Sequence, residues 1–360
     1  MASDKHPDIP FFSIPGNLAE LQALLKEAGL FNKSIHDLPG KWLLSGSKVT
    51  QMQFLAFHIV FPRIATATRL VDRDLAQYGL HMFWREAQDI LGRFDDFQKY
   101  LGLLVHQLSI EDISRDHPFF PSSLRILKDM QELCSPSYVS SKKGAVHRDA
   151  EHLSKRSVFG SKRRPDEEDT LANTANEEAE IETEATVNSA LVVFLRELAW
   201  LVDDRNCEFV YDPLAEKASF SKDTSFTAIT DGSLRRLNTG ETLAILEVKK
   251  RKRRQEPNAI PMQEAAELVC WLKSSYRSTP FLDGHPLIIS QDAHEIFLSF
   301  AFLDQLYLEY LQMPSVANPA WKYAAIQTYG PFKIDSAEDM NMFATLVISI
   351  TLAAKALPRN

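Results

Sequence analysis

The fold is decided by residues 231–249, DGSLRRLNTGETLAILEVK. An apolar run at 243–246 leads directly into Glu247, and an earlier run at 226–230 leads into Asp231. A run as apolar as 243–246 is typical of a strand that is covered on both faces. A carboxylate at the end of such a strand is costly unless it is paired or bound to a metal ion. We therefore expect two neighbouring strands whose acids meet at one edge of a sheet.

Glu247 and Lys249 are separated by one residue, so both side chains project from the same face of an extended strand. The two carboxylates and the carbonyl of Val248 are hard oxygen ligands of the kind that Mg²⁺ or Mn²⁺ prefers. Lys249 would then lie beside a metal-bound water and offset charge on a phosphoryl oxygen. The alternatives are a turn cap at Asp231, which precedes Gly232, and a plain salt bridge between strands.

Two helices flank these strands and carry further candidates. Gln263 and Glu267 are four residues apart on a helix predicted at 261–276, so they share a face. Gln263 is a candidate site residue, whereas a surface pair fits Glu267 equally well. In an earlier helix, Glu184 and Asn188 interrupt the apolar face and are placed to reach the metal site. For Glu184, an additional metal ligand, the alternative is an acidic first turn favoured by the helix dipole.

A run of cations directly follows Lys249, namely Lys250, Arg251, Lys252, Arg253 and Arg254. Clustered Lys and Arg neutralise phosphates, so we expect this run to contact the backbone of a nucleic acid. It would also fit a nuclear-import signal, and so would the basic part of residues 135–176. The formal net charge of −8 argues against a polyanion-binding surface over the whole molecule, so a local patch must make the contact.

The composition is that of a globular intracellular protein. With 360 residues and 45% hydrophobic content, the chain is long enough for two domains with real cores. Three cysteines, Cys134, Cys207 and Cys270, lie too far apart to indicate a zinc site or a disulfide framework. The amino terminus is polar, so we expect no secretion through a standard signal peptide, and no stretch is expected to span a membrane.

Three regions follow one another along the chain. Residues 1–134 are predicted to form an all-helical amino-terminal region, which could hold a protein partner. Residues 135–176 are charged and poor in apolar residues, as in a disordered linker. From residue 177 the predicted order is αβββαβ, which implies a mixed central sheet in an α/β or α+β domain over 177–360. Its predicted elements are a helix through residue 201, strands at 207–211, 225–231 and 242–249, the helix at 261–276, a strand at 286–290 and a last helix near 337–356.

The acids, the Glu-x-Lys and the glutamine resemble the motifs of the PD-(D/E)xK nuclease superfamily, which includes many restriction enzymes and the RecB-like nucleases. Asp231 matches the first acid, Glu247-Val248-Lys249 the Glu-x-Lys, and Gln263 the glutamine of RecB-like members. The chain is most similar to fungal PD-(D/E)xK nuclease-like proteins, in segments 231–234, 245–249, 262–267 and 329–332. The resemblance covers about 177–356. Glu267 departs from it, because RecB-like nucleases usually have tyrosine there, and the proline of the superfamily name does not precede Asp231.

The resemblance implies a restriction-endonuclease-like core and a Mg²⁺-dependent hydrolase that cleaves phosphodiester bonds, with DNA favoured over RNA as the substrate. Asp231 and Glu247 would bind the metal, Lys249 would position the attacking water, and Gln263 would orient the substrate or the lysine. The alternative is a nuclease-fold module without catalysis that binds nucleic acid or protein. The sequence does not indicate an oligomeric state.

Overall fold

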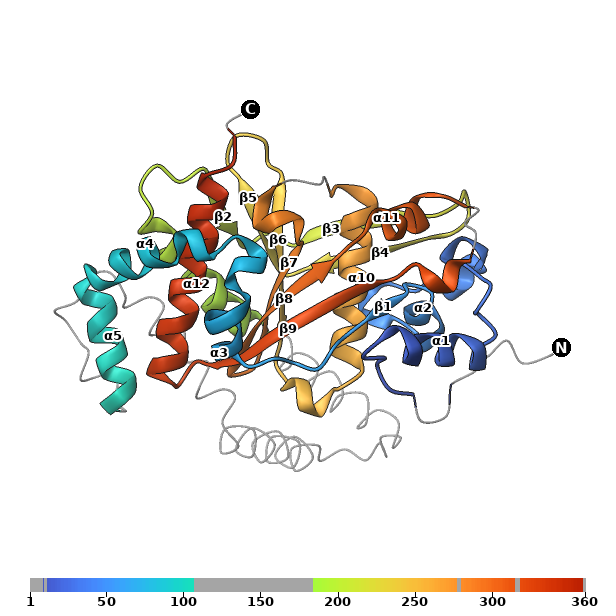
Figure 1. Ribbon diagram of the computed structural model, residues 1–360, viewed down its shortest axis with the longest axis horizontal. Coiled ribbons are helices and arrows are strands. Elements are labelled where there is room, and N and C mark those ends of the chain that lie inside the picture. Colours follow the sequence, from blue (N-terminus) through green and yellow to red (C-terminus); the bar gives the residue numbers. More distant parts are fainter. Residues whose placement is uncertain (1–8, 10–11, 107–183, 277–279, 315–317, 359–360) are drawn as a thin grey trace, which may run out of the picture.

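The computed structural model describes residues 9, 12–106, 184–276, 280–314 and 318–358 (Figure 1). Its centre is a seven-stranded mixed sheet with the order β1-β9-β8-β7-β6-β5-β2. The pairs β1–β9 and β6–β7 are parallel, and the other neighbours are antiparallel. The strands are β1 (Ile59–Val60), β2 (Cys207–Val210), β5 (Gly232–Arg236), β6 (Thr242–Lys249), β7 (Leu287–Asp292), β8 (Glu295–Phe302) and β9 (Ala324–Lys333). A separate antiparallel pair consists of β3 (Leu214–Ser219) and β4 (Ser225–Thr230).

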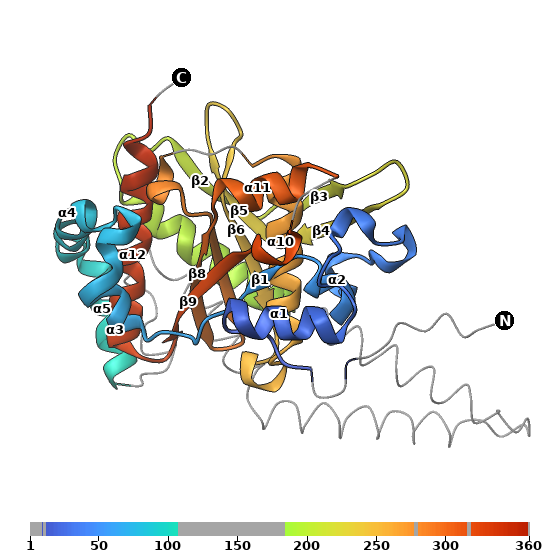
Figure 2. The same cartoon turned by 45° about the vertical axis from the view of Figure 1, so that its right-hand side comes forward.

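Helices cover both faces of the large sheet, and each face has its own hydrophobic core (Figures 1 and 2). The first face carries a helix over residues 184–200, α3 (Ala67–Arg69), α4 (His81–Gly92), α5 (Asp95–His106) and α12 (Ala337–Lys355). The second face carries α1 (Leu18–Glu27), α2 (Gln51–Leu55), α10 (Ala259–Ser274), α11 (Gln305–Gln312) and the β3–β4 pair. Short helical turns at Ile35–Asp37, Gly40–Trp42, Gly46–Lys48, Leu70–Asp74, Leu75–Tyr78, Arg253–Gln255, Phe281–Gly284 and Pro319–Trp321 connect these elements.

The alternation of side chains along β6 determines which face holds the candidate site. Ala244, Leu246 and Val248 belong to the core of the first face, and Ile245 belongs to the core of the second. Because side chains of a strand alternate, Glu247 and Lys249 share the face of Ile245 and therefore lie on the side that α10 covers. The second core is thus interrupted by polar groups at the carboxyl end of β6.

Residues at both ends of helix α12 stabilise its start and its end. Ser336 accepts a hydrogen bond from the backbone N–H of Asp339 through its side chain, and Lys355 lies in the last turn, as the helix dipole favours. Contrary to the expectation of no membrane-length segment, α12 is long and apolar enough to cross a membrane. However, 72% of its most apolar window is buried inside the protein, which is also typical of a core helix.

The structure confirms the mixed α/β class but differs from the prediction for the amino-terminal region. That region is not all-helical, because Ile59–Val60 forms β1 and pairs with β9 of the large sheet. Its apolar residues also join both cores: Leu21 and Phe54 lie in the second core, and Tyr78 and Leu91 lie in the first. The predicted boundaries after residues 134 and 176, and the predicted linker at 135–176, lie outside the described residues.

The structure also corrects the strand that was expected to lie beside β6. The run at 225–230 forms β4 of the small sheet, whereas β5, which the sequence did not predict, pairs with β6. Asp231 therefore lies where the chain passes from one sheet to the other, not in a hairpin turn. The next residue is glycine because a Cβ atom at Gly232 would approach the carbonyl oxygen of Val210 to 2.6 Å.

Candidate functional site

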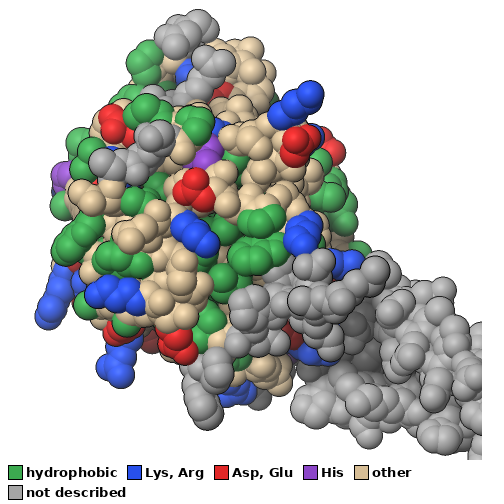
Figure 3. Space-filling model, turned by 90° about the vertical axis from the view of Figure 1, so that its right-hand side faces the viewer, with side chains coloured by type: hydrophobic (Ala, Val, Ile, Leu, Met, Phe, Trp, Pro, Cys, Tyr) green, Lys and Arg blue, Asp and Glu red, His purple; other side chains and the backbone are tan. Residues whose placement is uncertain are grey.

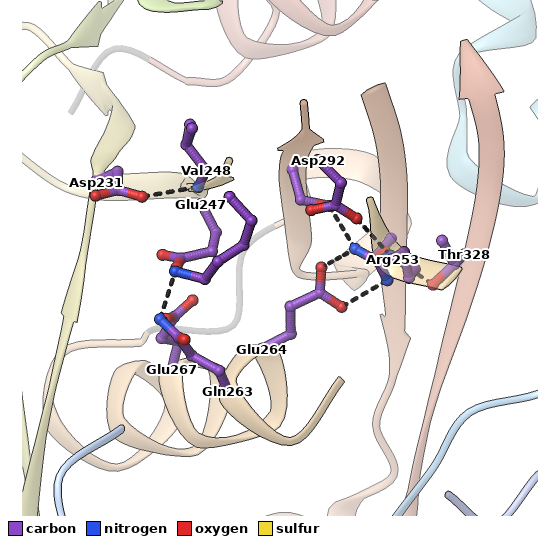
Figure 4. Close-up of polar contacts among 12 residues, drawn as sticks. Asp231, Glu247, Val248, Arg253, Gln263, Glu264, Glu267, Asp292 and Thr328 are labelled. Atoms are coloured by element: carbon purple, nitrogen blue, oxygen red, sulfur yellow. Dashed lines mark hydrogen bonds and ion pairs between the residues drawn. The ribbon is translucent and has the colours of Figure 1, made fainter. Parts of the chain in front are cut away.

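Three hydrogen bonds fix Asp231 at the junction between β4 and β5. Its backbone N–H donates to the carbonyl of Leu246 at 3.0 Å, and its Oδ2 accepts from the N–H of Val248 at 2.7 Å (Figure 4). On the opposite side, the amide of Asn188 donates to the Asp231 carbonyl at 3.0 Å. The helix at 184–200 and strand β6 thus hold this residue between them, and its carboxylate lies against the end of β6.

Glu247 lies at the centre of a group of polar side chains from three elements. The ammonium of Lys249 is 2.5 Å from Oε1 of Glu247 and 3.2 Å from Oε1 of Glu184. Gln263 of α10 donates through Nε2 to Glu247 Oε1 at 2.6 Å and to Oε1 of Glu267 at 2.9 Å. The structure therefore brings together the residues that the sequence singled out, namely Asp231, Glu247, Lys249, Gln263, Glu184 and Asn188.

Glu267 belongs to the same group, although the sequence left it between the site and the surface. Its side chain is on the buried face of α10, with 1% of its surface exposed. The sequence signal was its spacing of four residues from Gln263, which places both side chains on one face of the helix. Glu267 therefore adds a buried carboxyl group to the site.

The site has more acidic than basic groups. The carboxyl groups of Glu184, Glu247, Glu267 and Asp231 interact electrostatically with the ammonium of Lys249. Burial raises the pKa of Asp231 and of Glu247, and it raises the pKa of Glu267 to about 8. Burial alone would lower the pKa of Lys249, but the surrounding carboxylates outweigh this effect and raise it. The excess negative charge must be neutralised by protons or by a cation.

The oxygen atoms of the site are of the chemical type that binds a hard divalent cation. Oε2 of Glu247, Oε2 of Glu267 and Oδ1 of Asn188 are buried and have no hydrogen-bond partner among the described residues. Such oxygens are expected to bind water, a proton or a metal ion. However, in the part of the chain that the structure describes, no three His, Cys, Asp or Glu side chains are arranged as ligands of one ion. Asp231, Glu247 and the Val248 carbonyl therefore remain a predicted set that would need water to complete it.

The basic run after β6 differs from the predicted phosphate-binding patch. Arg253 is 6% exposed and forms ion pairs with Asp292 and Glu264, which argues against the predicted contact with nucleic acid. Arg251 pairs with Glu256 at 2.8 Å and Lys252 with Glu295 at 3.4 Å, which reduces the charge they offer to a phosphate.

For two cations of the run, the predicted contact with phosphate is compatible with their exposure. Arg254 is exposed and Lys250 is half-buried, so both remain candidates for phosphate contacts. Elsewhere, on the face over α1 and α2, lysine and arginine side chains are scattered singly (Figure 3). Among the described residues visible on that face, these side chains form no broad basic surface.

A comparison of the chain with protein-family models, curated proteins and solved structures finds no match. The function is therefore inferred from the geometry and chemistry of this chain's own residues. The group around Glu247 combines buried carboxylates, a lysine and an amide at one end of the large sheet.

Proposed function

We propose that this protein is a Mg²⁺- or Mn²⁺-dependent nuclease that hydrolyses phosphodiester bonds, with DNA favoured over RNA. One observation carries the proposal: Asp231, Glu247, Lys249 and Gln263 come from a sheet junction, a strand and a helix and converge on one end of β6. Metal-dependent phosphodiester cleavage needs acids to hold a cation and a group to position water, and these residue types supply both.

The order of elements also supports the proposal. The helix at 184–200, β2, β5, β6, α10 and β7 follow one another as αβββαβ, with the β3–β4 pair inserted between β2 and β5. The candidate acids lie at the start of β5 and near the end of β6, which are antiparallel neighbours, and β7 pairs parallel with β6. This is the order that the resemblance to PD-(D/E)xK nucleases leads us to expect.

Each residue has a proposed role. Asp231 and Glu247 would hold the cation together with the Val248 carbonyl, and Glu184 is a further candidate ligand. When bound, the ion would neutralise charge on the phosphoryl group and lower the pKa of a water molecule. Lys249 would position that water, and Gln263 would orient the Glu247 carboxylate, to which it donates at 2.6 Å.

The burial of the acids favours a second candidate function. The side chains of Glu247 and Glu267 are only 2% and 1% exposed, and Lys249 already neutralises part of the charge of Glu247. A site of this kind is also compatible with a nuclease-fold module that binds nucleic acid or a protein without cleaving. Calorimetric titration with Mg²⁺ and Mn²⁺ separates the two functions, because the binding module predicts no heat of metal binding at this site.

The nuclease proposal is tested by incubating the purified chain with single- and double-stranded DNA and RNA in Mg²⁺, Mn²⁺ or EDTA. The isosteric variant Glu247→Gln and the variant Lys249→Met are expected to lose at least 100-fold in cleavage rate, in the range found when a group that stabilises transition-state charge is removed. Glu338→Gln, an exposed acid at the start of α12, is the control and should cleave like the wild type. Equal cleavage by Glu247→Gln and the wild type would overturn the proposal.

A further inference from the structure

The guanidinium of Arg253 is the centre of a buried ion cluster next to the candidate site. Its Nε donates to Oδ2 of Asp292 at 2.8 Å, and its Nη1 donates to Oε2 of Glu264 at 3.0 Å. Its Nη2 donates to the other oxygen of Glu264 and, at 3.0 Å, to the hydroxyl of Ser290. The guanidinium also lies over the ring of Phe297, 4.6 Å from its centroid. All three guanidinium nitrogens are therefore engaged inside the protein (Figure 4).

The cluster lies one strand away from the candidate site, on the same face of the sheet. In the parallel pairing of β6 with β7, Glu247 is opposite Ser290 and Lys249 is opposite Asp292. On α10, Glu264 directly follows Gln263. The partners of Arg253 are thus the strand neighbours of Glu247 and Lys249 and the helix neighbour of Gln263.

Arg253 also fastens the connection between the two elements that carry the site. Residues 250–258 join the end of β6 to the start of α10, and Arg253 lies in the middle of this connection. A planar guanidinium that binds one carboxylate with two N–H groups fixes the orientation of both partners, which a lysine ammonium cannot do. Its bonds therefore tie the connection to β7 on one side and to α10 on the other.

We propose that Arg253 is a positioning residue that sets the distance between Glu247 on β6 and Gln263 on α10. The activity test of this inference rests on the proposed nuclease function. The distance between Glu247 and Gln263 that Arg253 sets does not depend on which function the site has. It replaces the role expected from the sequence, in which Arg253 would neutralise a phosphate. The two roles predict opposite changes in the kinetics of a variant.

A phosphate contact and a positioning role are separated by Arg253→Lys and Arg253→Met, with Arg93→Lys and Arg93→Met as controls at an exposed arginine outside the basic run. If Arg253 positions the site, Arg253→Lys lowers kcat at least tenfold while KM, DNA affinity and its salt dependence stay at wild-type values. If Arg253 contacts a phosphate, its loss in Arg253→Met weakens binding and lowers the slope of log K against log salt by about 0.9, with kcat unchanged. This second pattern would overturn the inference.

A spectroscopic readout tests the geometry without activity. The side-chain amide signals of Gln263 in a ¹⁵N-labelled sample are assigned by their loss in Gln263→Leu. In Arg253→Lys these signals should shift or broaden, whereas in Arg93→Lys they should stay in place. If Arg253→Lys does not fold, Asp292→Asn weakens one arm of the cluster, keeps the arginine and is expected to move the same signals.

The outcomes also distinguish the inference from the proposed function. A wild-type chain that cleaves no nucleic acid would overturn the nuclease proposal, while displaced Gln263 signals in Arg253→Lys would still support positioning. Unchanged Gln263 signals in a folded Arg253→Lys, or in Asp292→Asn where the lysine variant does not fold, would overturn the positioning role even if the wild type cleaves DNA.

Discussion

The ammonium of Lys249 and the amide of Gln263 both approach the same atom, Oε1 of Glu247, at 2.5 and 2.6 Å. The other oxygen, Oε2, has no hydrogen-bond partner among the described residues. Lys249 and Gln263 therefore engage only one oxygen of the carboxylate, and the buried second oxygen is expected to hold a proton, a water molecule or a cation. In the proposed nuclease, the lysine and a metal ion would use different oxygens of Glu247 and could act at the same time.

The first prediction concerns the loss of the lysine. In Lys249→Met, the buried Glu247 loses its cation, so the free energy of unfolding should fall toward the lower end of the range of about 3–5 kcal/mol that is typical of breaking a buried pair. The lower end applies because the lysine side chain is 19% exposed. Urea unfolding with and without Mg²⁺ measures the loss, and saturating Mg²⁺ should restore part of it.

Lys252→Met is the matched control for this change. Lys252 pairs with Glu295 at 3.4 Å and is 28% exposed, so its removal should cost less than about 1 kcal/mol. Equal losses of stability in Lys249→Met and Lys252→Met would show that the Lys249–Glu247 pair contributes no more than a surface pair.

The second prediction concerns pH. Burial raises the pKa of Glu267 from 4.5 to about 8, so the folded protein holds this proton more tightly than the unfolded chain. The resulting stabilisation is fully present below pH 4.5 and is lost as the pH rises to about 8. Glu267→Gln removes the titration but keeps the shape of the side chain.

Denaturant unfolding of both proteins between about pH 4.5 and 8.5, in the absence of divalent ions, checks this prediction. The wild type should lose stability relative to Glu267→Gln as the pH increases across this range. Parallel stability curves would mean that Glu267 keeps an ordinary pKa in the folded protein.

The third prediction concerns the support of Asp231 by Asn188. Asn188→Leu leaves the Asp231 carbonyl without the amide that donates to it at 3.0 Å, which should cost about 1–3 kcal/mol in stability. The cleavage rate should fall as well, because the Asp231 carboxylate is no longer held against β6. Thermal unfolding and cleavage assays measure both effects. Ser189→Ala, at the next residue of the same helix, should change stability by less than about 0.5 kcal/mol.

The fourth prediction tests the junction between the two sheets. A Cβ atom at Gly232 would lie 2.6 Å from the Val210 carbonyl oxygen, so Gly232→Ala should force β5 and β2 apart and destabilise the protein by about 1–3 kcal/mol. Gly92→Ala is the control, because a Cβ atom there meets nothing within 4 Å and alanine is the better helix former. Urea unfolding should show opposite signs for the two substitutions, and a stable Gly232→Ala would contradict the close approach.

The sequence predicted the elements that have strong internal patterns. Strand β6 and helices α10 and α12 agree with their predicted ranges to within two residues, because long apolar or periodic runs specify them locally. The common face of Glu247 and Lys249 also follows from the period of a strand. The sequence did not predict strand β5. Its residue Arg236 is charged but buried, because in the folded chain it contacts Glu241 and the carbonyl of Pro358.

Other features depended on contacts between distant segments. The stretch at 295–311 is rich in aromatic and aliphatic residues, and its pattern did not separate strand β8 from helix α11. In the sequence, nothing distinguishes Arg253 from the other cations of the basic run. Only the folded structure shows that Asp292 and Glu264 lie beside it and pair with it. The burial of Glu267 was likewise decided by the packing of α10 on the sheet and not by the local pattern.

The pairing of β1 with β9 has a consequence for the synthesis of the chain. Around this pairing, the hydroxyls of Tyr307 and Tyr310 donate to the carbonyls of Phe57 and Ala56, and the ring of His58 contacts the carbonyl of Lys322 across 264 residues. The segment near β1 therefore leaves the ribosome long before its partners exist. Contacts of such long sequence separation form slowly, so the segment around β1 reaches its folded environment only after residues 307–324 have been synthesised.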